Sequence, residues 1–61
     1  MLTPREKQVA TLVTHGLMNK EIAARLSISE GRVKCHVHEI LGKLDVTSRR
    51  DVAPALMEIS E

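Results

Sequence analysis

The sequence predicts an all-α domain of four short helices, three forming a core and the fourth packing against them. Apolar residues recur at helical spacing in four successive segments, and no stretch shows the strict alternation of a half-buried strand. With 61 residues, the chain forms one domain, residues 1–61. It contains no Phe, Trp or Tyr, so the core has to be built from aliphatic residues, Ala and Met.

The first helix begins at "LTPRE". Thr3 is a capping residue, and Pro4 suits the first helical position because its missing N–H would have no partner there. Glu6 completes a Thr-x-x-Glu capping box. Gly16 is expected to end the helix in the left-handed conformation. The apolar residues between keep helical spacing: Val9, Ala10, Leu12 and Val13.

The second and third helices are separated by the short connection "SIS". "NKEIAARL" is the second helix, with Asn19 as its expected N-cap. The third helix is "SEGRVKCHVHEILGKL", about residues 29–44, with Ser29 as its cap. Its apolar residues form one stripe along the helix: Val33, Val37, Ile40, Leu41 and Leu44.

The fourth helix starts in "SRRD" and contains a proline. A proline inside a helix removes one hydrogen bond and clashes with the preceding turn. Either this helix kinks at Pro54, or it begins nearer Asp51 than Ser48. Its apolar side consists of Val52, Ala53, Leu56 and Ile59.

The charge is unevenly distributed, although the net charge is only +1. Residues 19–50 carry a net charge of +3, and residues 51–61 carry −3. A basic middle favours a negatively charged partner, and an ordinary solvated surface is the alternative. The single cysteine cannot form a disulfide within the chain, and no apolar run approaches a membrane span. We therefore expect a cytoplasmic protein with no membrane partner.

The segment "CHVH" in the third helix raises the question of a metal or catalytic site. On a helical wheel Cys35 lies opposite the apolar stripe and can meet His38, whereas His36 points elsewhere. A zinc site needs four ligands, or three and a water, and a catalytic cysteine needs a base and a pocket. We expect no metal, no cofactor and no enzymatic activity. An exposed cysteine without a function is the remaining alternative.

A contact surface is the interpretation that this outer face favours. Two helices joined by a short turn, the second with a small and polar outer face, make a helix-turn-helix, whose second helix enters the major groove of double-stranded DNA. Lys34 and His38 can donate hydrogen bonds to guanine, and Cys35 can contact a thymine methyl group. The small residues Gly31 and Gly42 would allow close approach. A plain solvated face is the alternative.

Segments along nearly the whole chain resemble, in order, the LuxR/FixJ-type helix-turn-helix domain of bacterial transcription regulators. The resemblance is carried by "LTPRE" at 2–6, "GL" at 16–17, "NKEIA" at 19–23, "RL" at 25–26, "IS" at 28–29, "VK" at 33–34, "HV" at 36–37, "IL" at 40–41, "KL" at 43–44 and "SR" at 48–49. It implies a DNA-binding regulator, either the output domain of a larger response regulator or a small regulator on its own. A contact with RNA polymerase is a further partner that this interpretation includes.

The resemblance also implies roles for individual residues, with the third helix as the recognition helix. The implied base contacts come from Lys34, Cys35 and His38. The implied contacts to the DNA backbone come from Asn19, Lys20, Arg32 and His36. The fourth helix would form a homodimer through Val52, Leu56 and Ile59.

Three departures from the family pattern bear on these expectations. Gly31-Arg32 replaces a small polar or basic residue followed by Thr, His38 stands where Lys, Ser or Arg is common, and Pro54 interrupts the fourth helix. Two other hypotheses stay open. The chain could be a protein-interaction module that uses the apolar side of its fourth helix, or a small enzyme or metal protein that uses Cys35 and the histidines.

Overall fold

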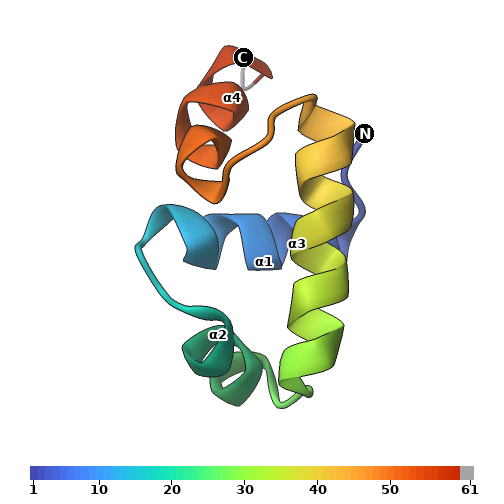
Figure 1. Cartoon of the computed structure of the whole chain (residues 1–61), viewed down its shortest axis with the longest axis vertical. Coiled ribbons are helices and arrows are strands. Elements are labelled where there is room, and N and C mark those ends of the chain that lie inside the picture. The colour runs from blue at the N-terminus through green and yellow to red at the C-terminus, as the bar shows by residue number, and fades with distance from the viewer. Residues whose placement is uncertain (60–61) are drawn as a thin grey trace.

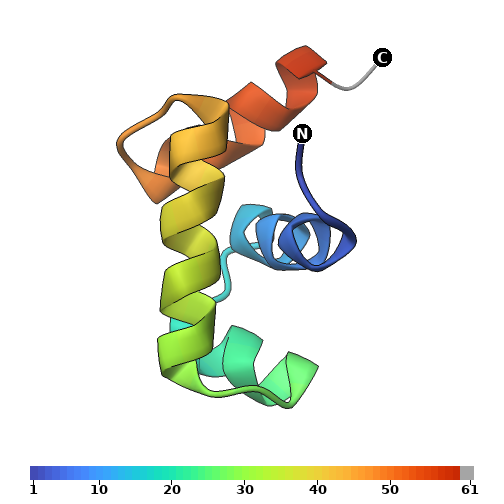
Figure 2. The ribbon, with the colours of Figure 1, turned by 90° about the vertical axis from the view of Figure 1, so that its right-hand side faces the viewer.

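The computed structural model describes the backbone of residues 1–59 and the side chains of residues 1–58, and this part of the chain is all-helical. The elements in order are α1 (Pro4–Thr14), α2 (Asn19–Leu26), α3 (Glu30–Leu44), a short 3₁₀ helix η1 (Arg49–Asp51) and α4 (Val52–Ile59). In Figure 1, α3 runs along the long axis, α1 crosses behind its middle, and α2 and α4 lie at opposite ends. The view turned by 90° shows the same arrangement (Figure 2). The predicted all-α fold is confirmed.

The core lies where α1, α2 and α4 meet the inner side of α3. Of the apolar stripe predicted on α3, Val33, Val37 and Ile40 are buried, and Leu41 and Leu44 are half-buried and pack against the core. The other helices and the N-terminal segment contribute the remaining buried apolar residues: Leu2, Val9, Ala10, Val13, Ile22, Ala23 and Val52. Aliphatic packing therefore replaces the missing aromatic residues.

The capping box at the start of α1 is confirmed. The backbone N–H of Glu6 donates to Thr3 Oγ1 at 3.1 Å, and the backbone N–H of Thr3 donates to Glu6 Oε1 at 2.9 Å. The same carboxylate oxygen accepts a hydrogen bond from Lys43 Nζ at 2.8 Å. The bond from Lys43 and the bond from the Thr3 N–H lower the pKa of Glu6 to about 2. The ionised carboxylate therefore suits its nearly buried position.

Three helices end in the same way. Gly16, Ser27 and Asp45 follow α1, α2 and α3 with φ values of 86°, 58° and 58°. In each case the next residue is apolar, and its N–H donates to a carbonyl in the last turns of the helix. These bonds join Leu17 to Leu12 at 3.2 Å, Ile28 to Ala23 at 3.0 Å, and Val46 to Leu41 at 3.0 Å. The prediction for Gly16 is confirmed.

The N-terminus of α2 differs from the prediction by one residue. Met18 occupies the N-cap position, and Asn19 is the first helical residue. The N–H of Met18 donates to Glu21 Oε1 at 2.7 Å, so the carboxylate of Glu21 satisfies the backbone at this end. The Asn19 side chain is thereby free to accept a hydrogen bond from another element. The expectation that Asn19 caps α2 is therefore wrong.

Of the two alternatives for the fourth helix, the later start is confirmed. The 3₁₀ helix η1 takes up residues 49–51, and α4 begins at Val52. Pro54 is then the third residue of α4, in the first turn, where its N–H would have no partner within the helix. No kink is needed to accommodate it.

Val52 faces the core of its own domain. Its side chain is 1% exposed, so it offers no surface to a second chain. This position corrects the expectation that Val52 lies at a dimer contact. Leu56 is half-buried against the same core. The side chain of Ile59, the third residue expected there, lies outside the described residues.

Candidate nucleic-acid interface

The connection between α2 and α3 is a tight turn with defined hydrogen bonds. Ser27 takes the left-handed conformation, and half-buried Ile28 packs against the core. Ser29 then caps α3, because its Oγ accepts from the N–H of Arg32 at 3.1 Å. Figure 2 shows the two helices joined by this turn at the end of the molecule away from α4. The turn fixes the angle at which α3 leaves α2.

The outer face of α3 brings together the three residues that the sequence predicts as base contacts. Lys34, Cys35 and His38 are exposed, and with Glu39 they line a shallow, open hollow. They come from consecutive turns on the side of α3 away from the buried stripe. The prediction that Cys35 and His38 share one face is consistent with this lining. The face presents a cation and an imidazole beside a small thiol.

The four residues predicted to contact the DNA backbone lie on α2 and α3. Lys20, in the first turn of α2, and Arg32, in the first turn of α3, are exposed. Asn19 and His36 are half-buried. The first turn of any helix leaves backbone N–H groups without intrahelical partners, and these groups attract anions. The first turns of α2 and α3 therefore each combine free backbone N–H groups with one exposed cation.

Arg49 also lies in this region, although its place in the sequence predicts no contact for it. Its Nη1 donates to Asn19 Oδ1 at 2.8 Å, and its Nη2 donates to the carbonyl oxygen of Leu17 at 2.9 Å. The contact joins η1 to the start of α2 across 30 residues of sequence. No local spacing signals such a pair. The "SR" at 48–49 is the one segment around Arg49 that the family resemblance includes.

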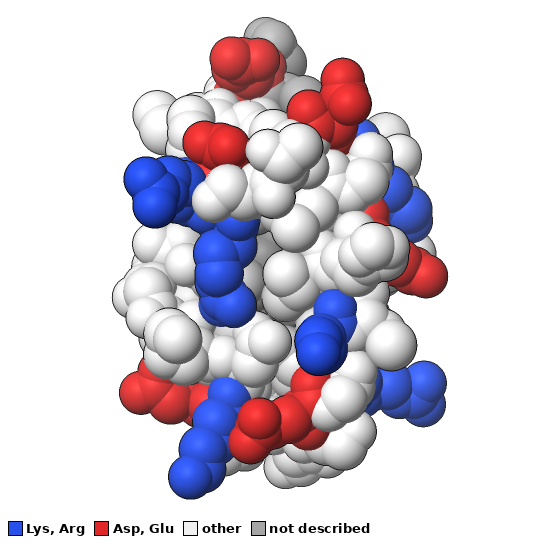
Figure 3. Space-filling model, in the orientation of Figure 1, with Lys and Arg blue, Asp and Glu red and all other residues white. Residues whose placement is uncertain are grey.

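Charges of both signs are spread over the surface. In the view of Figure 3, Lys and Arg side chains are distributed over the surface among uncharged residues, and carboxylates lie at both the α4 end and the α2 end. The chain has a net charge of only +1. The described surface shown in this view therefore has no large, uniformly basic patch.

The described part of the chain contains neither a group of side chains arranged as a metal site nor a membrane-spanning helix. Over residues 1–59, no group of three or more His, Cys, Asp or Glu side chains is placed to hold a metal ion. Cys35 is an exposed free thiol. Among the described helices, none is both long enough and apolar enough to cross a membrane.

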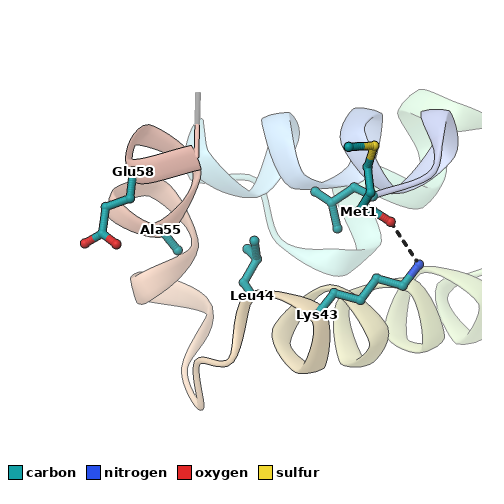
Figure 4. A pocket seen from close by; sticks show the side chains of 6 residues that line it. Met1, Lys43, Leu44, Ala55 and Glu58 are labelled. Atoms are coloured by element: carbon teal, nitrogen blue, oxygen red, sulfur yellow. Dashed lines mark hydrogen bonds between the residues drawn. The ribbon is translucent and has the colours of Figure 1, made fainter. Parts of the chain in front are cut away.

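A pocket of about 390 Å³ lies at the other end of the molecule, between the N-terminal segment, α3 and α4. Figure 4 shows Met1, Leu44 and Ala55 on its sides and Lys43 below Met1, whose carbonyl oxygen accepts from Lys43 Nζ at 3.5 Å. Met57, further along α4, is 77% exposed. This end of the molecule therefore has a pocket of mixed apolar and charged lining and one exposed methionine, apart from the hollow on the outer face of α3.

The sequence of the chain matches a family of known proteins. Residues 1–56 match the model of the luxR family of bacterial regulatory proteins. Over 52 residues, the chain is 54% identical to the uncharacterized transcriptional regulatory protein YhcZ of Bacillus subtilis and 48% identical to the nitrate/nitrite response regulator protein NarL of Escherichia coli. These alignments cover 85% of the chain but only 24% of each relative. The chain thus spans about a quarter of the length of these relatives, and it belongs to the luxR family of bacterial regulatory proteins.

Proposed function

We propose that this chain binds double-stranded DNA sequence-specifically and acts in the regulation of transcription. The observation that carries the proposal is the position of Lys34, Cys35 and His38 together on one open face of α3, directly after a tight turn from α2. The major groove is about 12 Å wide and admits one helix. With α3 in the groove, these three side chains would reach the edges of the bases.

The chemistry of the three residues suits base recognition. Lys34 donates to the O6 and N7 acceptors of guanine, and His38 donates to the same kind of acceptor. Cys35 is small enough for close approach and packs against a thymine methyl group. Each good base contact contributes about 1–3 kcal/mol of discrimination against a wrong base.

Contacts to the DNA backbone would hold α3 in register. Lys20 and Arg32 are exposed cations in the first turns of α2 and α3, where each helix also offers free N–H groups. Asn19 and His36, half-buried on the same two helices, would donate hydrogen bonds to further phosphate oxygens. Such contacts supply affinity and orientation without reading the sequence.

The relatives support a role within a larger regulator. NarL is named as a nitrate/nitrite response regulator, and TodT of Pseudomonas putida, 45% identical over 51 residues, as a response regulator protein. The chain covers less than a quarter of both. We therefore propose that it is the output domain of such a regulator, with a small regulator on its own as the alternative.

Two alanine variants test the assignment of roles. Lys34→Ala should weaken binding to a selected operator more than binding to random duplex, because it removes a base contact. Lys20→Ala should weaken both alike and lower the slope of log affinity against log salt by about 1. Equal effects of both variants on both DNAs would contradict the assignment.

The α4 end of the molecule supports a second candidate function, association with another protein chain. Met57 and the pocket beside α4 are its surface, and a second copy of the chain is the first partner to test. A dimer would read two half-sites about 34–36 Å apart or a multiple of this spacing. Sedimentation of the chain with and without Met57→Glu tests the contact. A monomer in both cases would exclude it.

A further inference from the structure

Arg49 joins the segment before α4 to the segment before α2. Its two guanidinium nitrogens donate to Asn19 Oδ1 and to the carbonyl oxygen of Leu17, at 2.8 and 2.9 Å. These acceptors lie on either side of Met18, the N-cap of α2. The planar guanidinium therefore holds the chain at the point where α2 begins.

Arg49 is itself held in place by its neighbours. It is the first residue of η1, where Ser48 Oγ accepts from the Arg50 N–H at 3.4 Å. Val52 follows directly after η1 and is buried in the core. Arg49 is half-buried, whereas the neighbouring Arg50 is exposed. The buried Val52 thus helps to position the guanidinium, and the guanidinium holds the chain on both sides of the α2 N-cap.

The hydrogen bond also sets the orientation of the Asn19 amide. A guanidinium has only donors, so the amide must turn its oxygen toward Arg49. The amide nitrogen of Asn19 then faces away. Within the side chains that the structure describes, no hydrogen bond uses that nitrogen. A donor held at the first residue of a helix is well placed for a phosphate oxygen.

We infer that Arg49 is a positioning residue for DNA binding, which acts through Asn19 and the start of α2 and not by touching a base. This inference rests on the proposed function. It differs from a phosphate contact made by the Arg49 charge itself. In that case a lysine at position 49 would serve as well, and the effects of changing Arg49 and Asn19 would be independent.

A double-mutant cycle on DNA affinity tests the inference. Arg49→Lys keeps the charge but loses the planar fork that reaches two acceptors. Arg49→Lys and Asn19→Ala should each weaken binding to random duplex about fivefold, and the double variant should be no weaker than either single one. Arg50→Lys, the matched exposed control, should bind like the unaltered chain. Losses that multiply in the double variant, or an unchanged affinity of Arg49→Lys, would overturn the inference.

A measurement without DNA accompanies the cycle. In ¹⁵N-labelled free domain, the side-chain NH₂ signals of Asn19 should move in Arg49→Lys and stay in place in Arg50→Lys. Far-UV circular dichroism confirms that each variant is folded. Unmoved signals in a folded Arg49→Lys variant would show that the guanidinium does not orient this amide, and would overturn the inference.

Asn19→Asp serves if Arg49→Lys fails to fold. It keeps an acceptor for Arg49 and removes the amide donor, so it should fold normally and lose affinity for random duplex. Normal affinity of Asn19→Asp would overturn the inference. Failure of the unaltered chain to bind any duplex would instead overturn the proposed function, and the inference with it.

Discussion

Lys43 Nζ lies 2.8 Å from Glu6 Oε1, and this ion pair joins the last turn of α3 to the first turn of α1. The same carboxylate closes the capping box with Thr3. One side chain thus stabilises the start of α1 and holds that start against α3. Because α3 carries the proposed DNA-contacting face, the ion pair also anchors that helix at its far end.

The pKa of Glu6 predicts how stability depends on pH. Its folded-state pKa is about 2, lowered from 4.5 chiefly by the hydrogen bond from Lys43. Because the folded-state pKa is lower than the unfolded value, the ionised carboxylate stabilises the fold. This stabilisation is fully present above the unfolded pKa of about 4.5 and is lost as the pH falls toward 2. Thermal midpoints of the unaltered chain and Glu6→Gln, followed by far-UV circular dichroism, should differ most above pH 4.5 and converge toward pH 2.

Glu58→Gln is the control for that experiment, because it makes the same change of charge at an exposed position of α4. It should leave the pH dependence of the midpoint close to that of the unaltered chain. A constant difference between Glu6→Gln and the unaltered chain across the whole pH range would contradict the role given to the carboxylate.

Gly16 and Gly42 form a matched pair for testing the end of α1. Gly16 has a φ of 86°, and Gly42 lies within α3; a Cβ at either position would meet nothing within 4 Å. Gly16→Ala should therefore lower the free energy of unfolding by about 1–2 kcal/mol through backbone strain alone. Gly42→Ala should gain about 0.5–1 kcal/mol, because alanine favours a helix interior. Urea unfolding of both variants measures the difference, and equal effects would contradict the left-handed conformation at Gly16.

Val52 tests whether the start of α4 belongs to the core. Val52→Ala removes a side chain that is 1% exposed, so it should cost about 2 kcal/mol of unfolding free energy. Met57→Ala, at a side chain that is 77% exposed on the same helix, should change stability little. The two variants are compared by urea unfolding at several protein concentrations. A loss in Val52→Ala that appears only at high concentration would place Val52 in a dimer contact after all.

Local signals in the sequence were sufficient for most of the helix boundaries. Thr3 and Glu6 form the capping box at α1, Pro4 begins that helix, and Ser29 caps α3, as their chemistry predicts. The outer and inner faces of α3 follow from the 3.6-residue period, because tertiary packing agrees with that pattern. The outward position of Lys34 and its neighbours was therefore predictable from the spacing of the apolar residues.

Features that depend on distant or unusual partners were not predictable in this way. The Glu6–Lys43 pair and the Arg49 contacts join residues 30 or more positions apart, which periodicity cannot detect. Met18 occupies the N-cap position of α2 although its side chain cannot accept a capping hydrogen bond. The Glu21 carboxylate accepts from the Met18 N–H instead. The burial of Val52 depended on where η1 ended and α4 began, and the segment around Pro54 is compatible with several helix starts.

An NMR titration of the ¹⁵N-labelled domain with a short random duplex, at about 50 mM and about 200 mM salt, tests the central claim most directly. The claim predicts shifts confined to Asn19, Lys20 and residues 32–39, which weaken at the higher salt as counterions compete for the phosphates. No shifts at either salt, or shifts confined to α4, would contradict it and would favour protein association as the function of this domain.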